Sequence, residues 1–234
     1  MSQLSNTIRT TALILCASVF MISSAYAQKW VKLAAFPDAS EEVYGISSGG
    51  KLYVLGGLAP GWTPKGLVYE YDPADDTWTK KKNMPVSAHH VAVAELNGKI
   101  YVIGGRLGNA FIGRAANTDV VEGYDPATDQ WSPTLTRMPT PRSALTWGTY
   151  KGKIYVAGGE MQNAYMAAAF RAVEAFDPAT NTWSTLPSLE FPRHGAGGDI
   201  VGSRLHVVTG VVQASGSGGH SDVDFHHALE LESK

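Results

Sequence analysis

Hydrophobic and polar residues along this chain follow one short pattern that returns at a nearly constant interval. Each copy begins with a β-branched and aromatic run ending in two glycines, as in LYVLGG, IYVIGG and IYVAGG, and LHVVTG is a weaker fourth copy. An aromatic-Asp-Pro sequence and a tryptophan follow, as in YDPADDTW, YDPATDQW and FDPATNTW. Steps of 48 to 53 residues separate the tryptophans Trp30, Trp78, Trp131 and Trp183. Such a period indicates repeats of one supersecondary unit.

The second copy shows which elements the repeat predicts. Its glycine run begins at an Asn-Gly pair, and Asn-Gly between two strand-like runs is a strong signal for a β-hairpin. We therefore expect residues 90–95 and 99–103 to form adjacent strands. A third strand, 120–124, should end at the Asp-Pro turn, and a fourth should carry Trp131. Each copy thus predicts a four-stranded antiparallel meander, with strands a to d, and helical periodicity is nearly absent.

Four-stranded units with Gly-Gly, Tyr-Asp-Pro and Trp at these positions resemble Kelch repeats, and the resemblance covers nearly all of residues 28–234. It implies an all-β fold, a β-propeller whose blades pack face to face round a central channel. The glycines would then let strand b lie close to its neighbours, and the aromatic residues would form blade cores rather than a cofactor site. The units are expected at about 37–84, 85–138, 139–188 and 189–234, the last joined by 28–36.

The two ends of the repeat region predict how the ring closes. Residues 28–36 contain only a d-type strand around Trp30, whereas the last unit stops after a c-like run, 226–231. Pairing these segments would complete four four-stranded blades and cover two sheet edges that otherwise favour aggregation. Kelch propellers usually have more blades than four. A shortened relative of a larger propeller and assembly from two chains therefore stay open, and an incomplete ring would self-associate.

The first 27 residues do not follow the repeat. Arg9 precedes an apolar stretch, 11–22, and an Ala-Tyr-Ala sequence ending at Ala27 is typical of a signal peptidase site. The stretch is too short to span a bilayer. A lipoprotein signal at Cys16 is disfavoured, because Leu15 is bulky where such sites need a small residue. The pattern predicts a signal peptide, 1–27, cleaved after Ala27, and a secreted or periplasmic protein.

Composition narrows the class of partner. Cleavage would remove the only cysteine, so the remaining chain could form no disulfide even in a compartment that permits them. A formal net charge of −2 gives no reason to expect nucleic acid or an anionic membrane as a partner. With 44% hydrophobic residues, the chain can bury a substantial core. We expect no cofactor and no membrane insertion after cleavage.

Strand order predicts the face on which a ligand would bind. In an up-and-down meander the b–c and d–a connections emerge on one face, which we call the loop face. The tight a–b and c–d turns emerge on the other face. The b–c loops are long and unlike one another, and dissimilar loops on a rigid scaffold commonly build binding sites. These loops span 58–66, 106–119, 160–171 and 211–224.

Polar residues of the d–a connections should converge at the channel mouth on the same face. Counting back ten residues from the start of each strand b gives Glu41, His89, Ser143 and His194 as equivalent positions. Clustered arginines with few lysines suit bidentate binding of carboxylates. The candidate ligand-binding residues are Glu41, Glu42, His89, His90, Arg106, Arg114, Arg142, Glu160, Arg171, Arg193 and His194.

Each candidate also has a purely structural interpretation. Arg142 and Arg193 follow prolines at blade entrances and could tie neighbouring blades through backbone carbonyls. His89 and His90 could serve packing alone. The segment 220–227 contains three histidines and two aspartates, which are metal-binding residue types. A strand there would point alternate side chains apart, so we expect no metal site.

Two functions stay open. The first is a binding module that holds a protein or small ligand on the loop face without catalysis, as most Kelch propellers do, and no nucleophile-base set is legible in the sequence. The second is an enzyme, because exported bacterial Kelch propellers include sialic acid mutarotases. In that case Glu160, Arg193, His194 and Arg106 would provide a carboxylate anchor and a proton shuttle. Copper chemistry like that of galactose oxidase is not expected, since it requires a cysteine that the cleaved chain lacks.

Overall fold

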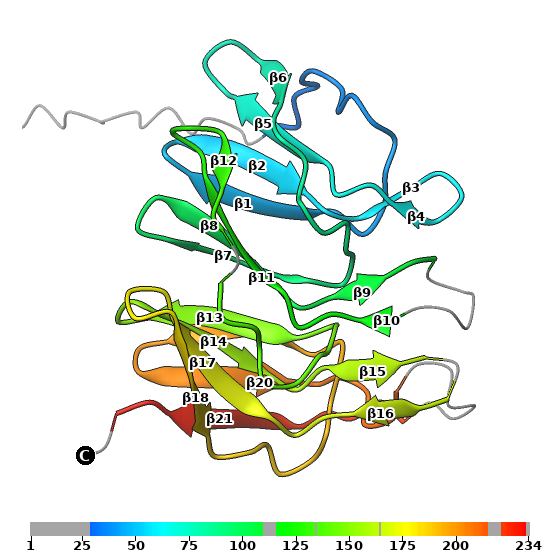
Figure 1. Cartoon of the computed structure of the whole chain (residues 1–234), viewed down its shortest axis with the longest axis vertical. Coiled ribbons are helices and arrows are strands. Elements are labelled where there is room, and N and C mark those ends of the chain that lie inside the picture. Colours follow the sequence, from blue (N-terminus) through cyan, green and yellow to red (C-terminus); the bar gives the residue numbers. More distant parts are fainter. Residues whose placement is uncertain (1–28, 110–115, 134, 164, 215–220, 233–234) are drawn as a thin grey trace, which may run out of the picture. The chain divides into compact units, whose positions relative to one another are not determined.

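The structure, a computed structural model, describes residues 29–109, 116–133, 135–163, 165–214 and 221–232. The chain divides into two compact units, 1–33 and 34–234, and the repeats lie in the second. All regular structure in the described residues is β-strand, arranged as a series of small antiparallel sheets (Figure 1). The predicted all-β fold is therefore confirmed.

Four sheets carry the repeats, and we call them blades 1 to 4. Blade 1 contains β1 (Tyr44–Ser48), β2 (Lys51–Leu55), β5 (Val68–Asp72) and β6 (Thr77–Lys80). Blade 2 contains β7 (Ala92–Leu96), β8 (Lys99–Ile103), β11 (Val121–Asp125) and β12 (Gln130–Trp131). Blade 3 contains β13 (Thr146–Tyr150), β14 (Lys153–Ala157), β17 (Val173–Asp177) and β18 (Thr182–Leu186). Blade 4 contains β19 (Gly197–Val201), β20 (Arg204–Val208) and β21 (His226–Glu230).

The strands of blade 2 follow the predicted meander, with small shifts of β7 and β11. β8 has the predicted bounds, and β11 begins one residue later than expected. β7 begins at Ala92 instead of His90, because His90 has a left-handed backbone (φ 54°) that interrupts an extended strand. The repeat therefore locates strand b more accurately than strand a.

Blade 4 has three strands in the described residues, and β21 pairs there with β20. Residues 29–33 form no strand, and the side chain of Trp30 is fully exposed. The predicted closure of the ring by a strand around Trp30 is therefore not among the described pairings. It stays a prediction, as does the count of four complete blades.

Residues just after that segment do follow the register of the repeat. The indole N–H of Trp78 donates to the carbonyl of Ala34 at 3.1 Å, just as that of Trp131 donates to Lys82 at 3.0 Å. The indole of Trp183 makes the equivalent bond in blade 3, at 2.9 Å. Ala34 thus occupies the position relative to Trp78 that Lys82, which follows β6, occupies relative to Trp131, as the spacing of the tryptophans predicts.

The b–c loops contain three short hairpins that the sequence analysis did not predict. They pair β3 (Leu58–Ala59) with β4 (Thr63–Pro64), β9 (Arg106–Leu107) with β10 (Ala116–Asn117), and β15 (Glu160–Gln162) with β16 (Ala167–Ala169). All three project from the same ends of their blades (Figure 1). The long loops are therefore ordered near their bases.

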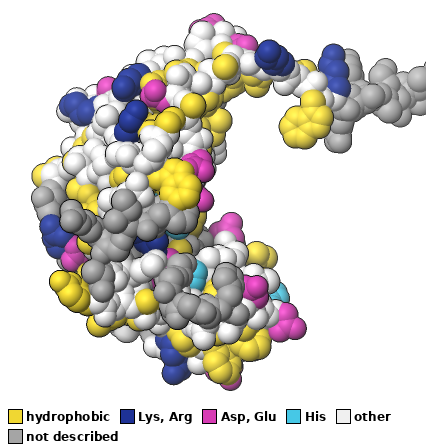
Figure 2. Space-filling view, turned by 90° about the vertical axis from the view of Figure 1, so that its right-hand side faces the viewer, with side chains coloured by type: hydrophobic (Ala, Val, Ile, Leu, Met, Phe, Trp, Pro, Cys, Tyr) yellow, Lys and Arg dark blue, Asp and Glu magenta, His cyan; other side chains and the backbone are white. Residues whose placement is uncertain are grey.

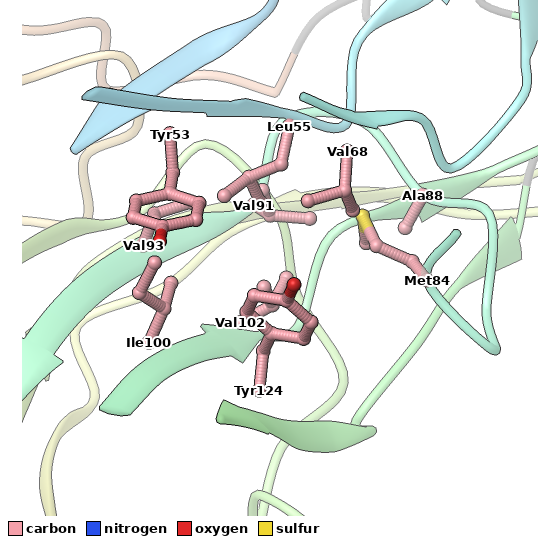
Figure 3. Packing of buried hydrophobic residues seen from close by; sticks show 10 residues of the cluster. All are labelled: Tyr53, Leu55, Val68, Met84, Ala88, Val91, Val93, Ile100, Val102 and Tyr124. Atoms are coloured by element: carbon pink, nitrogen blue, oxygen red, sulfur yellow. The ribbon is translucent and has the colours of Figure 1, made fainter. Parts of the chain in front are cut away.

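The hydrophobic core lies between the blades. Tyr53 and Leu55 of β2 point toward Ile100 and Val102 of β8 (Figure 3). The same arrangement repeats between blades 2 and 3 and between blades 3 and 4. Full burial of one such side chain contributes about 1.5–3 kcal/mol, so these interfaces provide much of the folding free energy.

Aromatic pairs complete the core within each of the first three blades. Their ring centroids are 4.9 Å apart for Tyr71 and Trp78, 5.0 Å for Tyr124 and Trp131, and 5.2 Å for Phe176 and Trp183. The repeat pattern predicts these residues in the blade cores, and the structure confirms that prediction.

The paired glycines allow adjacent blades to approach closely. Gly104 and Gly158, the first glycines of their pairs, have φ values of 65° and 64°. A Cβ at Gly104 would lie 2.6 Å from the carbonyl oxygen of Arg142, which belongs to the next blade. At Gly158 it would lie closer still to the carbonyl of Arg193. Any side chain here would therefore collide with backbone, which explains why the pattern requires glycine.

Candidate functional site

One backbone element recurs at the loop end of every blade. The sequence predicts four equivalent residues, one in each d–a connection. Each of them forms an antiparallel bridge with the first residue of the b–c loop in its own blade. These pairs are Glu41 with Leu58, His89 with Arg106, Ser143 with Glu160, and His194 with Val211. Both backbone hydrogen bonds of each pair measure 2.8–3.1 Å. We call Glu41, His89, Ser143 and His194 the inner ring, and its predicted equivalence is confirmed.

A left-handed residue follows each member of the inner ring. These residues are Glu42, His90, Ala144 and Gly195, with φ between 53° and 60°. Left-handed backbone is unfavourable for residues other than glycine, so its repetition indicates a constraint of the whole assembly. Hydrogen bonds supply that constraint: the N–H of Ala144 donates to the carbonyl of His90, and that of Gly195 to the carbonyl of Ala144.

Three of the predicted site residues form a buried network across blades 2, 3 and 4. Nη2 of Arg106 lies 2.5 Å from Oε1 of Glu160, and Nε2 of His194 lies 3.6 Å from Oε2 of the same carboxylate. All three residues are buried. Nε2 of His194 also donates to the carbonyl of Gln213 at 2.8 Å. We call Arg106, Glu160 and His194 the loop-face triad.

Asn117 of β10 supports this triad and was missed by the sequence analysis. Its Nδ2 donates to the carbonyl of Glu160 at 2.9 Å and to Oγ of Ser143 at 2.8 Å. Its Oδ1 accepts a hydrogen bond from the N–H of Gln162 at 3.0 Å. Because these contacts tie blade 2 to blade 3, Asn117 holds the loop-face triad in place. No local motif marks it, and only its position at the end of a long loop could have suggested it.

His89, His90 and Glu42 lie next to the triad. Nδ1 of His89 is 2.6 Å from Nδ1 of His90, and Nε2 of His90 is 3.9 Å from Oε2 of Glu42. Burial, with help from the charges of His90 and Arg106, lowers the pKa of His89 to about 4. Burial also lowers the pKa of His90. Both imidazoles are therefore neutral at pH 7, so one Nδ1 donates its proton to the other.

Arg142 does not join this group. It is fully buried inside blade 3, where Nη2 donates to Oε2 of Glu174 at 2.8 Å. Its carbonyl accepts a hydrogen bond from the N–H of Gly105, in the preceding blade, at 2.9 Å. The side chain of Arg142 thus serves packing, and its backbone carbonyl joins neighbouring blades, as the structural interpretation predicts.

Arg193 is likewise turned into its own blade. Its guanidinium lies 3.4 Å from the carbonyl of Thr209, 3.3 Å from that of Phe225 and 3.1 Å from Nδ1 of His227. Its own carbonyl accepts the N–H of Gly159 from the preceding blade at 2.7 Å. These contacts agree with the structural interpretation of Arg193, and its role in ligand binding stays a prediction.

The other candidates contribute differently. Glu41 is exposed, and its backbone belongs to the inner ring. Nε of Arg171 donates to the carbonyl of Leu189 at 2.5 Å, so this guanidinium is held against a d–a connection. Arg114 lies outside the described residues. The structure thus brings together Glu42, His89, His90, Arg106, Glu160 and His194.

Histidines at the start of β21 point to different partners. His226 lies 2.9 Å from His206, between ring nitrogens, whereas His227 contacts Arg193. His220 falls outside the described part of the chain. Within the described residues, no three His, Cys, Asp or Glu side chains are grouped so as to hold a metal ion.

Large apolar side chains are exposed on the loop face. Trp62, between β3 and β4, is 39% exposed, and Tyr165 and Met166, between β15 and β16, are 98% and 55% exposed. Figure 2 looks onto this face, where histidine, acidic and basic side chains lie near its middle. The face therefore combines a buried polar base with apolar tips.

Antiparallel blades of this kind, with packed interfaces and glycine-paired strands, define a Kelch-type β-propeller domain. The chain belongs to this family: the model described as the KLHDC2/KLHL20/DRC7 Kelch-repeats domain matches residues 27–232. No helix in the described part of the chain is long and apolar enough to cross a membrane.

Known proteins similar to this chain include other Kelch proteins. Kelch-like protein 35 of Mus musculus is 29% identical over 82% of this chain and 30% of its own length. Kelch-like protein terF of Aspergillus terreus is 32% identical over 69% of this chain and 37% of its own length. The chain thus spans about a third of the length of these two relatives.

A solved structure, that of YjhT, has a similar fold. It aligns with a TM-score of 0.67 and 24% identity, and the match covers 80% of this chain and 64% of that one. At this level of identity the similarity concerns the fold alone.

Proposed function

We propose that this chain is an exported Kelch propeller whose loop face binds a protein or a small ligand without catalysis. The exposure of Trp62, Tyr165 and Met166 on that face is the observation that carries the proposal. Exposed aromatic side chains on a rigid frame are typical anchors of binding surfaces. Trp62 also has a φ of 60°, and a bulky residue in this strained region often marks a functional position.

The loop-face triad supports binding over catalysis, because several of its polar groups are already bonded within the fold. Arg106 is paired with Glu160, and the N–H of His194 is held by a backbone carbonyl. A buried ion pair of this kind is costly to break, so it suits a frame that fixes the loops. Protein ligands would contact the hairpin tips above it.

Site-specific photocrosslinking tests the binding face. A photoreactive amino acid replaces Tyr165, or in the control Thr180, which is exposed in the turn between β17 and β18 at the opposite end of the same blade. The proposal expects a discrete crosslinked partner from position 165 and none from 180, with loss of that product in Trp62→Ser/Met166→Ser. Equal crosslinking at both positions would refute it.

The export part of the proposal rests on the first 27 residues. Mass spectrometry of protein recovered from the periplasm or medium should show a chain beginning at Gln28. Retention of residues 1–27 on a cytoplasmic product would overturn it. Mass measurement in solution of the same sample shows whether the chain self-associates, as the prediction for an incomplete ring requires.

A second candidate function, sugar mutarotation of the sialic acid type, is favoured by one observation. Arg106, Glu160 and His194, three of the four residues nominated for that chemistry, meet in one buried network. N-acetylneuraminate should then raise the melting temperature, and exchange between its anomers, followed by NMR, should be faster with the protein. Glu160→Gln should abolish both effects, whereas Glu122→Gln, a buried carboxyl outside the triad, should keep them. Absence of both effects in the unmodified protein rules this function out.

A further inference from the structure

A second concave site lies among the inner strands of the blades, away from the loop face. It is a cavity of about 530 Å³ lined by residues of β1, β7 and β13 and by residues 196–199 at the start of blade 4. Ser47, Glu95 and Thr149 lie in it near the ends of their strands. These ends lead into the tight a–b turns, at the opposite end of the blades from the b–c loops.

One repeat position beside the cavity carries residues of very different size. Trp147 of β13 pairs with Val156, and the equivalent residues in the other blades are Gly45, Val93 and Gly198. Of these four residues, Val93, Trp147 and Gly198 line the cavity. Trp147 is half-buried, and its ring centroid lies 6.2 Å from that of Tyr44. One flat aromatic wall thus borders an open space.

The polar side-chain groups of the cavity are two carboxylates, hydroxyls and the indole N–H of Trp147. Oε1 of Glu95 accepts the N–H of Gly98, and Oδ1 of Asp199 accepts the N–H of Ile200, each at 2.7 Å. Within the described residues, the second oxygen of each carboxylate has no hydrogen-bond partner. The lining contains no Lys, Arg or His. An anionic ligand would therefore meet uncompensated negative charge.

We propose that this cavity binds a neutral saccharide of one or two rings, independently of the loop face. The apolar face of a pyranose packs on Trp147, because aromatic faces carry partial negative charge that attracts polarised C–H groups. Sugar hydroxyls donate to Glu95 and Asp199, since ionised carboxylates are acceptors only. A cavity of this volume with one aromatic wall and few polar groups has the dimensions of a small-ligand site.

Calorimetric titration of the full-length chain with glucose, galactose, N-acetylglucosamine, cellobiose, lactose and chitobiose tests the proposal. At least one should bind with a Kd below about 1 mM. Asp199→Asn and Glu95→Gln, which preserve shape, should each weaken that binding about tenfold. Trp62→Phe, on the loop face, should leave it unchanged, and N-acetylneuraminate should not compete.

Absence of binding by all six sugars at about 10 mM overturns the proposal, as does equal affinity in both carboxylate variants and the unmodified chain. Competition by N-acetylneuraminate does the same, because it places the sugar at a site that accepts anions. Crosslinking from position 165 is unaffected by Asp199→Asn if both sites exist. Failure of this inference is thereby distinguished from failure of the loop-face function.

Discussion

Blades 2 and 3 have a glutamate at the same buried position, but only the glutamate of blade 3 has a cationic partner. Glu122 of β11 lies opposite Val102, and Glu174 of β17 lies opposite the equivalent Val156. In blade 3 the carboxylate meets Arg142, one residue before the inner ring. In blade 2 the residue before the inner ring is Ala88, which offers no charge. Blades 2 and 3 therefore share a buried glutamate but differ in its electrostatics, whereas the same position holds Tyr69 in blade 1 and His227 in blade 4.

The missing arginine changes the chemistry of Glu122. Its Oε1 accepts one hydrogen bond, from the N–H of Val86 at 2.8 Å. Burial raises the pKa of this carboxyl from its ordinary 4.5 to about 7. The carboxyl of Glu122 is thus about half protonated near pH 7, whereas Glu174 has an ionic partner. The stability of blade 2 should depend on pH, and the stability of blade 3 should depend on the cationic partner of Glu174.

Removing the cation from blade 3 should have the largest effect. Arg142→Ala leaves Glu174 buried without its partner, and breaking such a pair costs about 3–5 kcal/mol. Urea unfolding at pH 7 measures the change. The double variant Arg142→Ala/Glu174→Gln should recover part of the loss, because it also removes the charge. A loss below about 1 kcal/mol in the single variant would mean that the pair carries little net energy.

A change of pH should alter the stability of the chain by an intermediate amount, and it should act through blade 2, not blade 3. Because the folded pKa of Glu122 lies above its unfolded value, folding retains a proton, and stability falls as pH rises from about 4.5 to about 7. Glu122→Gln removes this dependence and should stabilise the chain by about 1–2 kcal/mol above pH 7. Urea unfolding at pH 5 and pH 8 gives the two values. An unchanged slope between these pH values in the variant would show that other groups cause it.

The sequence predicted the backbone arrangement of these blades better than the contacts of their charged side chains. Spacing of the glycines and tryptophans placed β8 and equated His89 with His194, since both follow from backbone geometry. It could not separate Arg106, which meets Glu160, from Arg142, which is turned into its blade. Both are arginines near the inner ring, and the direction of each side chain depends on a register that only the folded sheets define. The short hairpins were missed because two or three residues carry no alternating pattern.

Relief of backbone strain should produce a smaller gain in blade 3. Ala144 has φ 53°, and blade 4 has Gly195 at the same position. Ala144→Gly removes a left-handed penalty of about 1–2 kcal/mol, partly offset by the greater freedom of glycine in the unfolded chain. We expect a net gain of about 0.5–1 kcal/mol, or about 1–3 °C in Tm. Ala94→Gly, in the middle of β7, is the control and should lower Tm.

The outer strands of blades 2 and 3 should show the smallest difference, which is confined to the local exchange of their amides. β18 runs for five residues, Thr182–Leu186, whereas β12 ends at Trp131, two residues before Pro133, whose ring holds φ away from the extended values of a strand. Amides of β18 should therefore exchange with solvent about threefold more slowly than those that follow Trp131, a local difference of about 0.6 kcal/mol. Hydrogen exchange followed by mass spectrometry measures both segments in one sample. Pro133→Thr should slow exchange in blade 2 and leave β18 unchanged, and equal rates in the unmodified chain would show that the proline does not limit the strand.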